Sequence, residues 1–222
     1  MRRWYQDACG TALAMDLVGE RWAMLIVREL LLGPRRFGEI RGALPGLSAN
    51  VLTQRLEGLA RAGILRRRAL PSPANAQVYE LTRWGYALEE PIFALSRWAA
   101  GSPTHDVTLP LSNTAMMLSL RTMMDPVRGA ALGEQLDGEI GFLIGGEPFR
   151  AAIANGRLDA RRATPDGATL VFEGDTAGLR PVFYGPAPLA ATEAAGLVKV
   201  TGDRALAQRF VDCFALPHFV TD

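Results

Sequence analysis

Apolar residues recur at helical spacing through the first sixty residues of the chain. The pattern predicts four helices, over residues 8–18, 21–32, 37–43 and 48–62. In the fourth helix Leu52, Leu56 and Leu59 repeat at positions i, i+4 and i+7, so they share one face. Ser48 is suited to cap its N-terminus and Gly63 its C-terminus, which predicts a helix with sharp ends.

A β-hairpin is predicted after these helices. Two runs, over residues 64–70 and 78–81, flank a segment rich in Pro, Ser, Ala and Asn, as expected for two strands and a long tip. Thr82 is a candidate N-cap for a helix that runs to Ala100, and Pro91 is expected to kink that helix. This order of helices, turn and hairpin is that of a winged helix-turn-helix.

Beyond residue 101 the pattern changes from helical to mixed. Residues 101–104, Gly-Ser-Pro-Thr, form the clearest linker. A helix is expected over residues 112–125, and Asn-Gly at 155–156 is a strong hairpin signal. The expected strands are 139–147, 149–155, 158–162, 168–173 and 197–200, and the later helices are 176–184 and 203–214. The sequence therefore predicts an α+β protein of two domains, residues 1–101 and 102–222.

Charge differs between the two predicted domains. Residues 1–101 hold 14 Arg against nine acidic residues, a net charge of +5. Residues 102–222 hold 10 basic against 14 acidic residues, a net charge of −4. A basic domain joined to an acidic one suggests different partners, and the basic domain is the one suited to face a polyanion.

Composition narrows the class of protein. The 49% hydrophobic and 21% charged residues are ordinary for a soluble chain with real cores. No apolar run is long enough for a signal peptide or a membrane span, so we expect a cytoplasmic protein. The two cysteines and two histidines lack the spacing of zinc ligands, and no catalytic grouping is recognisable. The sequence predicts neither an enzyme nor a metal or cofactor site.

The face of residues 48–62 opposite the leucines is polar. Asn50 and Gln54 lie on it, with Thr53 close by and Arg55 on a flank. Amide side chains make paired hydrogen bonds to adenine edges, and threonine contacts a base edge or a thymine methyl group. The candidate base-reading residues of this helix are Ser48, Asn50, Thr53, Gln54 and Arg55.

Arginines on and near the hairpin are candidates for contact with a DNA backbone. Arg66, Arg67 and Arg68 follow one another on the first strand, where alternation puts Arg66 and Arg68 on one face and Arg67 on the other. Arginine on a wing suits phosphate contact or entry into the minor groove. The other candidate contacts are Arg35 and Arg36, before the short helix, and Gln77 at the hairpin tip.

Cys9 is followed by six distinctive stretches: AMDLVGERW at 14–22, IVRELLLGPRRF at 26–37, LPGLS at 44–48, LTQRL at 52–56, AGIL at 62–65 and VYELT at 78–82. In the order and spacing of these stretches, residues 9–100 resemble the HxlR-type winged-helix regulators of bacteria. The resemblance implies a homodimer, paired through the N-terminal helix and the helix after the wing. It also implies that this dimer binds a pseudo-palindromic operator in double-stranded DNA.

Cys9 is a candidate redox site through the same resemblance. In some regulators of this family a cysteine at this place senses oxidants or electrophiles. Arg2 and Arg3 are near in sequence and would favour the thiolate form. The alternative is a small buried residue at the start of a helix.

Four stretches of the second predicted domain form a further pattern: IGGEPF at 144–149, IANGRL at 153–158, LVFEGD at 170–175 and GLVKVTGDR at 196–204. Through these stretches, residues 106–216 are similar to the sterol-carrier-protein type-two fold. The similarity implies a five-stranded sheet covered by helices, with an apolar tunnel between them. The methionine-rich helix at 112–125 suits such a tunnel, although methionine also fills ordinary cores. The candidate effector-binding residues are Met116, Met117, Leu120, Met124, Phe142, Phe149 and Phe183.

These features favour a transcriptional regulator that responds to an apolar small molecule bound by residues 102–222. To act, the molecule must bind the two DNA-affinity states unequally. Three alternatives stay open. The second domain only assembles the dimer, the protein is a redox sensor through Cys9 with a purely structural second domain, or it is a lipid-carrier-like protein whose winged helix makes protein contacts.

Overall fold

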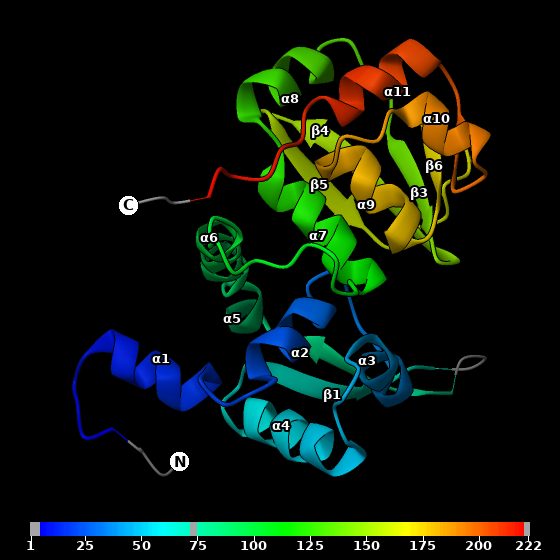
Figure 1. Ribbon diagram of the computed structural model, residues 1–222. Helices are drawn as coiled ribbons and strands as arrows, with labels where there is room; N and C mark the ends of the chain where they lie inside the picture. Colours follow the sequence, from blue (N-terminus) through cyan, green and yellow to red (C-terminus); the bar gives the residue numbers. More distant parts are fainter. Residues whose placement is uncertain (1–4, 72–74, 220–222) are drawn as a thin grey trace. The chain divides into compact units, whose positions relative to one another are not determined.

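A computed structural model describes residues 5–71 and 75–219 of the chain. The chain divides into two units, Met1–Ala94 and Leu95–Asp222 (Figure 1). The division falls inside helix α6, Glu89–Ala100, whereas the predicted border lies in the linker that follows this helix. The roles predicted for the two domains stay predictions.

Four helices and a hairpin make up most of the first unit. Its elements are α1 (Gly10–Val18), α2 (Ala23–Leu30), α3 (Phe37–Ala43), α4 (Ala49–Arg61), β1 (Leu65–Ala69), β2 (Gln77–Leu81) and α5 (Arg83–Tyr86). The four predicted helices and the hairpin are all present. Ser48 caps α4 as expected, because its hydroxyl accepts a hydrogen bond from the Val51 backbone N–H at 3.3 Å.

The core of the first unit lies between α2, α4 and the base of the hairpin. Leu52, Leu56 and Leu59 of α4 are buried, as are Ile26 and Leu30 of α2. Burial of each such side chain stabilises the fold by about 2 kcal/mol. The apolar face of α4 is therefore fixed inward, and its polar face is left at the surface.

The hairpin is held to the segment before α3 by a short third strand pairing. The Arg35 backbone N–H donates to the Tyr79 carbonyl at 3.0 Å, and the Tyr79 N–H donates to the Arg35 carbonyl at 2.8 Å. Because β2 is paired on both edges at this point, the wing is anchored to the helices rather than projecting as an isolated ribbon.

The prediction of one helix over residues 82–100 with a kink at Pro91 is wrong. The chain forms the short α5 and then α6, and the interruption at residues 87–88 precedes Pro91. Pro91 lies in the first turn of α6, where a missing N–H removes no helical hydrogen bond. Gly85 lets α5 pack closely, because an added Cβ would lie 2.0 Å from the Ile64 carbonyl oxygen.

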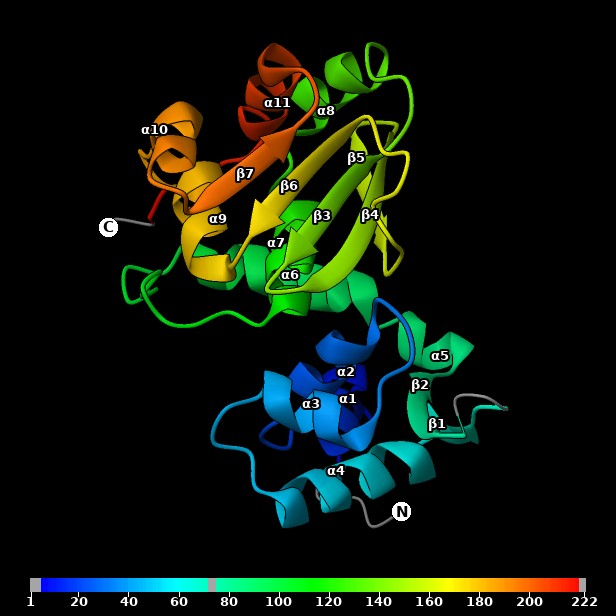
Figure 2. The ribbon, with the colours of Figure 1, turned by 90° about the vertical axis from the view of Figure 1, so that its right-hand side faces the viewer.

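The second unit is a five-stranded sheet with helices (Figure 2). Its further elements are α7 (Asn113–Met123), α8 (Pro126–Gly133), β3 (Ile140–Ile144), β4 (Glu147–Ala154), β5 (Arg157–Arg161), β6 (Leu170–Gly174), α9 (Thr176–Tyr184), α10 (Leu189–Ala194), β7 (Val198–Thr201) and α11 (Arg204–Val211). The strand order is β5-β4-β3-β6-β7, with β3 and β6 parallel and the other neighbours antiparallel. The predicted α+β class and the five-stranded sheet are confirmed.

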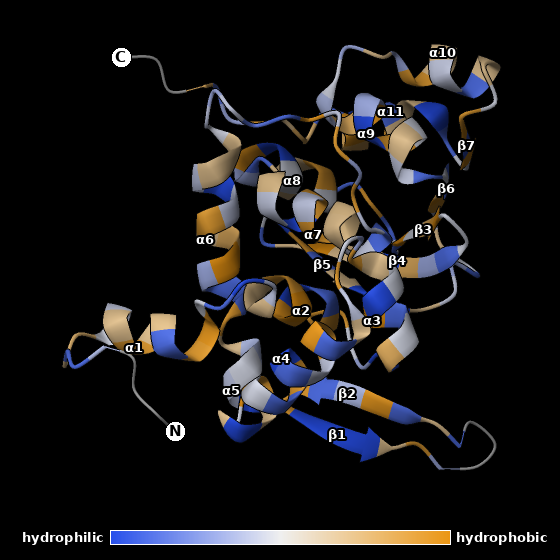
Figure 3. Cartoon of the chain, turned by 60° about the horizontal axis from the view of Figure 1, so that its bottom comes forward, coloured by the Kyte–Doolittle hydropathy of each residue, from blue (hydrophilic) through white to orange (hydrophobic). Residues whose placement is uncertain are grey.

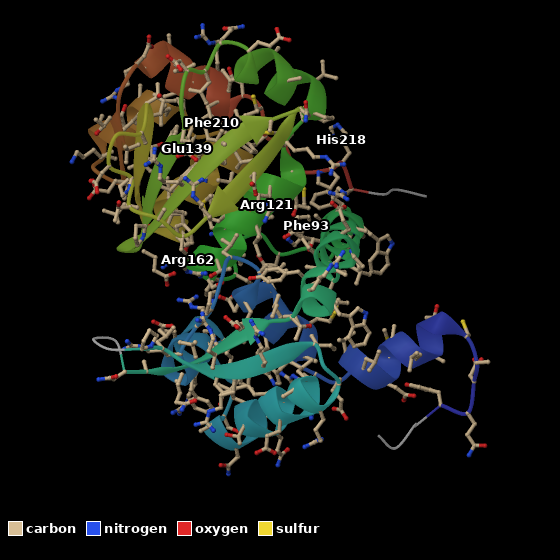
Figure 4. All side chains as sticks on the ribbon, turned by 180° about the vertical axis from the view of Figure 1, so that it is seen from behind. Phe93, Arg121, Glu139, Arg162, Phe210 and His218 are labelled. Atoms are coloured by element: carbon tan, nitrogen blue, oxygen red, sulfur yellow. The ribbon has the colours of Figure 1, made fainter. Side chains whose placement is uncertain are left out.

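The sheet has a buried face and a polar face. Ile140, Phe142 and Ile144 of β3 are wholly buried, and the helices lie together on one side of the sheet (Figures 2 and 4). On the opposite face Arg161 pairs with Glu139, with Nη2 and Oε2 3.0 Å apart. This one-sided covering concentrates the apolar core between the sheet and the helices.

Two helices of the second unit, α8 and α10, are absent from the prediction. The start of α8 carries a readable signal, because Asp125 accepts hydrogen bonds from the N–H groups of Val127 and Arg128, both at 2.9 Å, and Pro126 occupies the first turn. Gly129 lowers the helix propensity of this segment, which argues against a helix in the sequence. In the structure the glycine permits close packing, since an added Cβ would lie 2.8 Å from the Met124 sulfur.

Candidate nucleic-acid interface

The exposed face of α4 carries the polar side chains that the sequence predicts there. Asn50, Thr53 and Gln54 are exposed. The Thr53 hydroxyl donates to the Ala49 carbonyl at 3.0 Å, which fixes its rotamer and leaves its methyl group and oxygen lone pairs accessible. Ser48 is also exposed, but its hydroxyl is engaged as the helix cap. The structure thus brings an amide, a hydroxyl and a second amide together within five consecutive residues of one helix.

Arg55 lies on the flank of α4 and turns away from this face. Its Nη2 is 2.7 Å from Glu20 Oε2, and its Nε donates to the Arg21 carbonyl at 3.1 Å. The side chain is 25% exposed. Arg55 therefore joins α4 to the segment between α1 and α2, a contact that spacing within α4 could not reveal.

The wing strand β1 is hydrophilic along most of its length (Figure 3). The alternation predicted for its arginines holds: Arg66 and Arg68 lie on the side of Glu80, whereas Arg67 pairs in register with Tyr79. Arg66 Nε is 2.6 Å from Glu80 Oε1, and Arg68 Nε is 2.9 Å from Glu80 Oε2. One carboxylate is thus shared by two arginines, so that face of the wing is less basic than the sequence alone indicates.

Arg35 does not fit the predicted contact with phosphate. Its side chain is 7% exposed, and its Nη1 donates to Glu29 Oε2 at 3.2 Å. Glu29 is wholly buried and also accepts from Arg28 Nη2 at 2.8 Å. A buried carboxylate needs such partners, because an uncompensated charge in the interior is strongly destabilising. Arg35 therefore belongs to the interior of the unit.

Sequence reasoning missed the Glu29 ion-pair cluster, although a signal was present. Glu29 stands three positions after Ile26 and beside Leu30, on the apolar stripe of α2. A charged residue on a buried helix face indicates an internal partner. Arg36 and Gln77 differ from Arg35, because both are exposed and remain candidate backbone contacts.

Cys9 is the N-cap residue of α1 and is exposed, so the alternative of a buried structural cysteine is wrong. The backbone N–H of Thr11, then the Thr11 side chain and the N–H of Ala12, lower the pKa of the Cys9 thiol below its ordinary value. Arg2 and Arg3, expected to favour the thiolate, lie outside the described residues. These groups at the start of α1 favour the thiolate form.

The seven candidate effector-binding residues all lie in the core of the second unit. They are Met116, Met117, Leu120, Met124, Phe142, Phe149 and Phe183, each at most 8% exposed. Phenylalanine rings fill the space between sheet and helices: Phe142 stacks on Phe172 at 5.7 Å, and Phe183 meets Phe172 at 5.5 Å. The predicted apolar tunnel stays a prediction, and these residues stabilise the core in the structure described.

Two polar contacts cross this apolar layer. The Tyr184 hydroxyl donates to Ser119 Oγ at 2.9 Å, which ties α9 to α7. Burial raises the pKa of Tyr184 far above its usual range, and the Ser119 hydrogen bond opposes that shift. The Arg162 guanidinium lies 5.3 Å from the centre of the Phe149 ring, as expected for a cation–π contact.

Within residues 5–71 and 75–219, no three His, Cys, Asp or Glu side chains gather so as to hold a metal ion. Across the same residues no helix has the length and apolar character needed to cross a membrane.

Comparison with known proteins places the first unit among helix-turn-helix proteins. A family model described as HxlR-like helix-turn-helix matches residues 17–106. The "Uncharacterized HTH-type transcriptional regulator YvaP" of Bacillus subtilis (strain 168) is 42% identical over 86 residues, which are 39% of this chain and 80% of that protein. The HTH-type transcriptional regulator YodB of the same strain is 37% identical over 86 residues, which are 39% of this chain and 77% of that protein.

One solved structure is also similar to part of this chain. The reduced form of the transcriptional regulator YodB from B. subtilis has 33% sequence identity and a TM-score of 0.40. The match covers 45% of this chain and 100% of that chain. The family model ends at residue 106, so residues 107–222 lie outside its match.

Proposed function

The chain belongs to the HxlR-like helix-turn-helix family, and we propose that it controls transcription by placing α4 in the major groove of an operator. It is a DNA-binding transcriptional regulator of the HxlR type.

Base reading by α4 rests on one observation, the exposed face formed by Asn50, Thr53 and Gln54 over a buried leucine face. The major groove admits an α-helix, and amide side chains there distinguish adenine from the other bases. The helix is rigid because Ser48 caps it and its leucines are buried. A rigid helix holds these side chains in the fixed geometry that paired hydrogen bonds require.

The wing supplies a backbone contact in this proposal. Arg67 is exposed on the face away from Glu80, which suits it to phosphate. Arg66 and Arg68 contribute less, because Glu80 accepts a hydrogen bond from each. Arg36 and Gln77, both exposed, complete the proposed backbone contacts.

We also propose that the regulator is a homodimer on a pseudo-palindromic operator. Exposed apolar side chains on α1 and on α6 support the formation of a dimer. On α1, Leu13 and Met15 are 41% and 44% exposed, and on α6 Trp98 is 79% exposed. Single exposed leucines are ordinary on monomers, whereas a tryptophan so exposed suits an interface. Analytical ultracentrifugation tests the assembly, and a monomer at micromolar concentration would exclude it.

Redox regulation through Cys9 is a second candidate, supported by the exposed thiol at the start of α1 and its lowered pKa. The thiolate is the reactive form of cysteine, so a lowered pKa speeds its reaction with oxidants and electrophiles at neutral pH. The test is operator binding with and without diamide, for the native chain and for Cys9→Ser. An equal response of the two proteins would exclude the idea.

For the second unit, regulation by an apolar molecule between α7 and the sheet remains a proposal. Its support is the chemistry of α7, since Met116 and Met117 have flexible, polarizable side chains that can repack around a guest. Native mass spectrometry of gently purified protein, with a thermal-shift screen of apolar compounds, tests it. With no retained ligand and no shift, the unit would have a purely structural or dimer-assembling role.

The experiment that tests the proposed function is a gel shift with DNA from upstream of the chain's own gene. The double variant Asn50→Ala, Gln54→Ala should lose the specific shift. Gln135→Ala, an exposed amide on the second unit, serves as the matched control and should bind as the native chain does. No specific shift by the native chain, on this or other genomic DNA, would instead favour a lipid-carrier-like protein whose winged helix contacts other proteins.

A further inference from the structure

The joint between α1 and α2, residues 19–22, contacts α4 and lies near the turn that precedes it. α1 ends at Val18 and α2 begins at Ala23, so only four residues separate the helices. Glu20 and Arg21 meet α4 itself, and Trp22 lies near the turn that precedes α4. All of these residues lie within the first unit.

The contact with α4 uses one edge of the Arg55 guanidinium. Nη2 is 2.7 Å from Glu20 Oε2, and Nε is 3.1 Å from the Arg21 carbonyl oxygen. Both bonds reach across more than thirty positions of sequence, so they tie two separate elements. Because a carboxylate already neutralises this arginine, little of its charge is left to attract a phosphate group.

Trp22 gives the joint a defined shape. Its φ of 80° and ψ of −19° lie in the left-handed region, which a bulky side chain rarely adopts. Such a conformation persists only where the surroundings hold it. The Arg21 guanidinium lies 5.1 Å from the Trp22 ring centre, and an added Cβ at Gly46 would lie 3.9 Å from Trp22 Cη2. The turn before α4 is therefore next to the strained residue.

We propose that Arg55 is a positioning residue and that its bond to Glu20 sets the angle of α4 relative to α1. This inference rests on the proposed function, since it assumes that α4 reads DNA. The joint comes directly after α1 in the chain, so a displacement of α1 moves Glu20. Because Glu20 is bonded to Arg55, the displacement is transmitted to α4. The joint thereby links the N-terminal helix to base recognition without any contact of its own with DNA.

The two roles for Arg55 predict opposite effects of Glu20→Gln. If Arg55 positions α4, the loss of the carboxylate loosens the helix, and affinity for the specific fragment falls by up to about fivefold. Affinity for a scrambled fragment of equal length and the slope of log affinity against log salt stay unchanged. If Arg55 contacts phosphate, releasing it raises affinity for both fragments and steepens the salt slope by about one.

Two further variants complete the test. Glu20→Gln combined with Arg55→Gln should bind the specific fragment no more weakly than the weaker single variant, because both substitutions break the same contact. Glu57→Gln is the matched control, since Glu57 is an exposed acid on α4 that faces Arg61 at 3.9 Å rather than the joint. It removes the same charge from the same region and should not lower the specific affinity.

The outcomes separate the inference from the function it rests on. Without a specific shift by the native chain the proposed function fails, whatever the variants do. If the native chain binds specifically and Glu20→Gln binds as tightly as Glu57→Gln or more tightly, the positioning role is overturned and the function stands. Thermal unfolding of each variant, followed by circular dichroism, checks that all the proteins are folded under the conditions of the binding assay.

Discussion

Glu80 lies opposite Arg66 across the two strands of the wing, and its Oε1 is 2.6 Å from Arg66 Nε. The other oxygen of the same carboxylate accepts from Arg68 at 2.9 Å. Glu80 is 8% exposed, whereas the side chains of Arg66 and Arg68 are 67% and 46% exposed. The wing therefore carries a smaller net charge than its three consecutive arginines indicate.

Glu80→Gln should strengthen DNA binding that does not depend on sequence. The amide keeps the size of the side chain but no longer neutralises the two arginines. We expect affinity for a scrambled fragment to rise severalfold and the salt slope to steepen by about one. A filter-binding or anisotropy series over salt measures both quantities. An unchanged slope would show that the wing face next to Glu80 does not approach DNA.

Arg35→Ala and Arg67→Ala should separate an internal arginine from an interfacial one. Removing Arg35 takes a partner from the wholly buried Glu29 and should destabilise the protein by about 3 kcal/mol. Removing the exposed Arg67 should leave stability within about 0.5 kcal/mol. It should also reduce the magnitude of the salt slope by about one. Urea denaturation and the binding series provide the two readouts, and a destabilisation by Arg67→Ala equal to that of Arg35→Ala would contradict the assignment.

Cys9 should react with iodoacetamide at a lower pH than an ordinary thiol. The Thr11 and Ala12 groups lower its pKa from 9.0, so the thiolate fraction at neutral pH rises. Cys213 is an internal control, because burial raises its pKa to about 11. The rate at Cys9 should reach half its maximum below pH 9, and Thr11→Val should move that midpoint upward. A Cys9 midpoint equal to that of the urea-unfolded chain would refute the shift.

Side chains bond to the backbone of both edge strands of the five-stranded sheet. At β7, Glu193 Oε1 accepts from the Val200 N–H at 3.0 Å, and at β5 Arg121 Nε donates to the Leu158 carbonyl at 3.2 Å. Unpaired edge strands promote association of sheets. Glu193→Ala should therefore make the protein self-associate with rising concentration, as light scattering measures. Glu173→Ala is the control. It removes an acid that forms an ion pair with Lys199 on the neighbouring strand, and it should leave light scattering unchanged.

Much of the first unit follows from local chemistry. The spacing of Leu52, Leu56 and Leu59, together with the Ser48 cap, was enough to predict α4 and its exposed polar face. The alternation of strand side chains was enough to put Arg66 and Arg68 on one side. These features depend on residues a few positions apart, so the sequence pattern contains them.

The remaining features depend on residues that are distant in sequence. Arg35 turns inward because its backbone pairs with Tyr79 and its side chain meets Glu29. Arg55 binds Glu20, which lies 35 positions before it. The spacing of residues along one helix does not identify Glu29 as the partner of Arg35 or Glu20 as the partner of Arg55, since many arginines and acids fit the same local pattern. The core between α7 and the sheet likewise depends on which phenylalanines the topology brings together.

The measurement that tests base reading by α4 most directly is a series of single base-pair substitutions across the operator. The affinity for each substituted operator fragment is measured with the native chain and with the Gln54→Ala variant. Each mismatch should cost the native chain about 1–3 kcal/mol at contacted positions. Gln54→Ala should lose discrimination at one base pair of each half-site and retain it elsewhere. Equal discrimination at every position by both proteins would contradict the account, because it would mean that the exposed face of α4 does not read DNA.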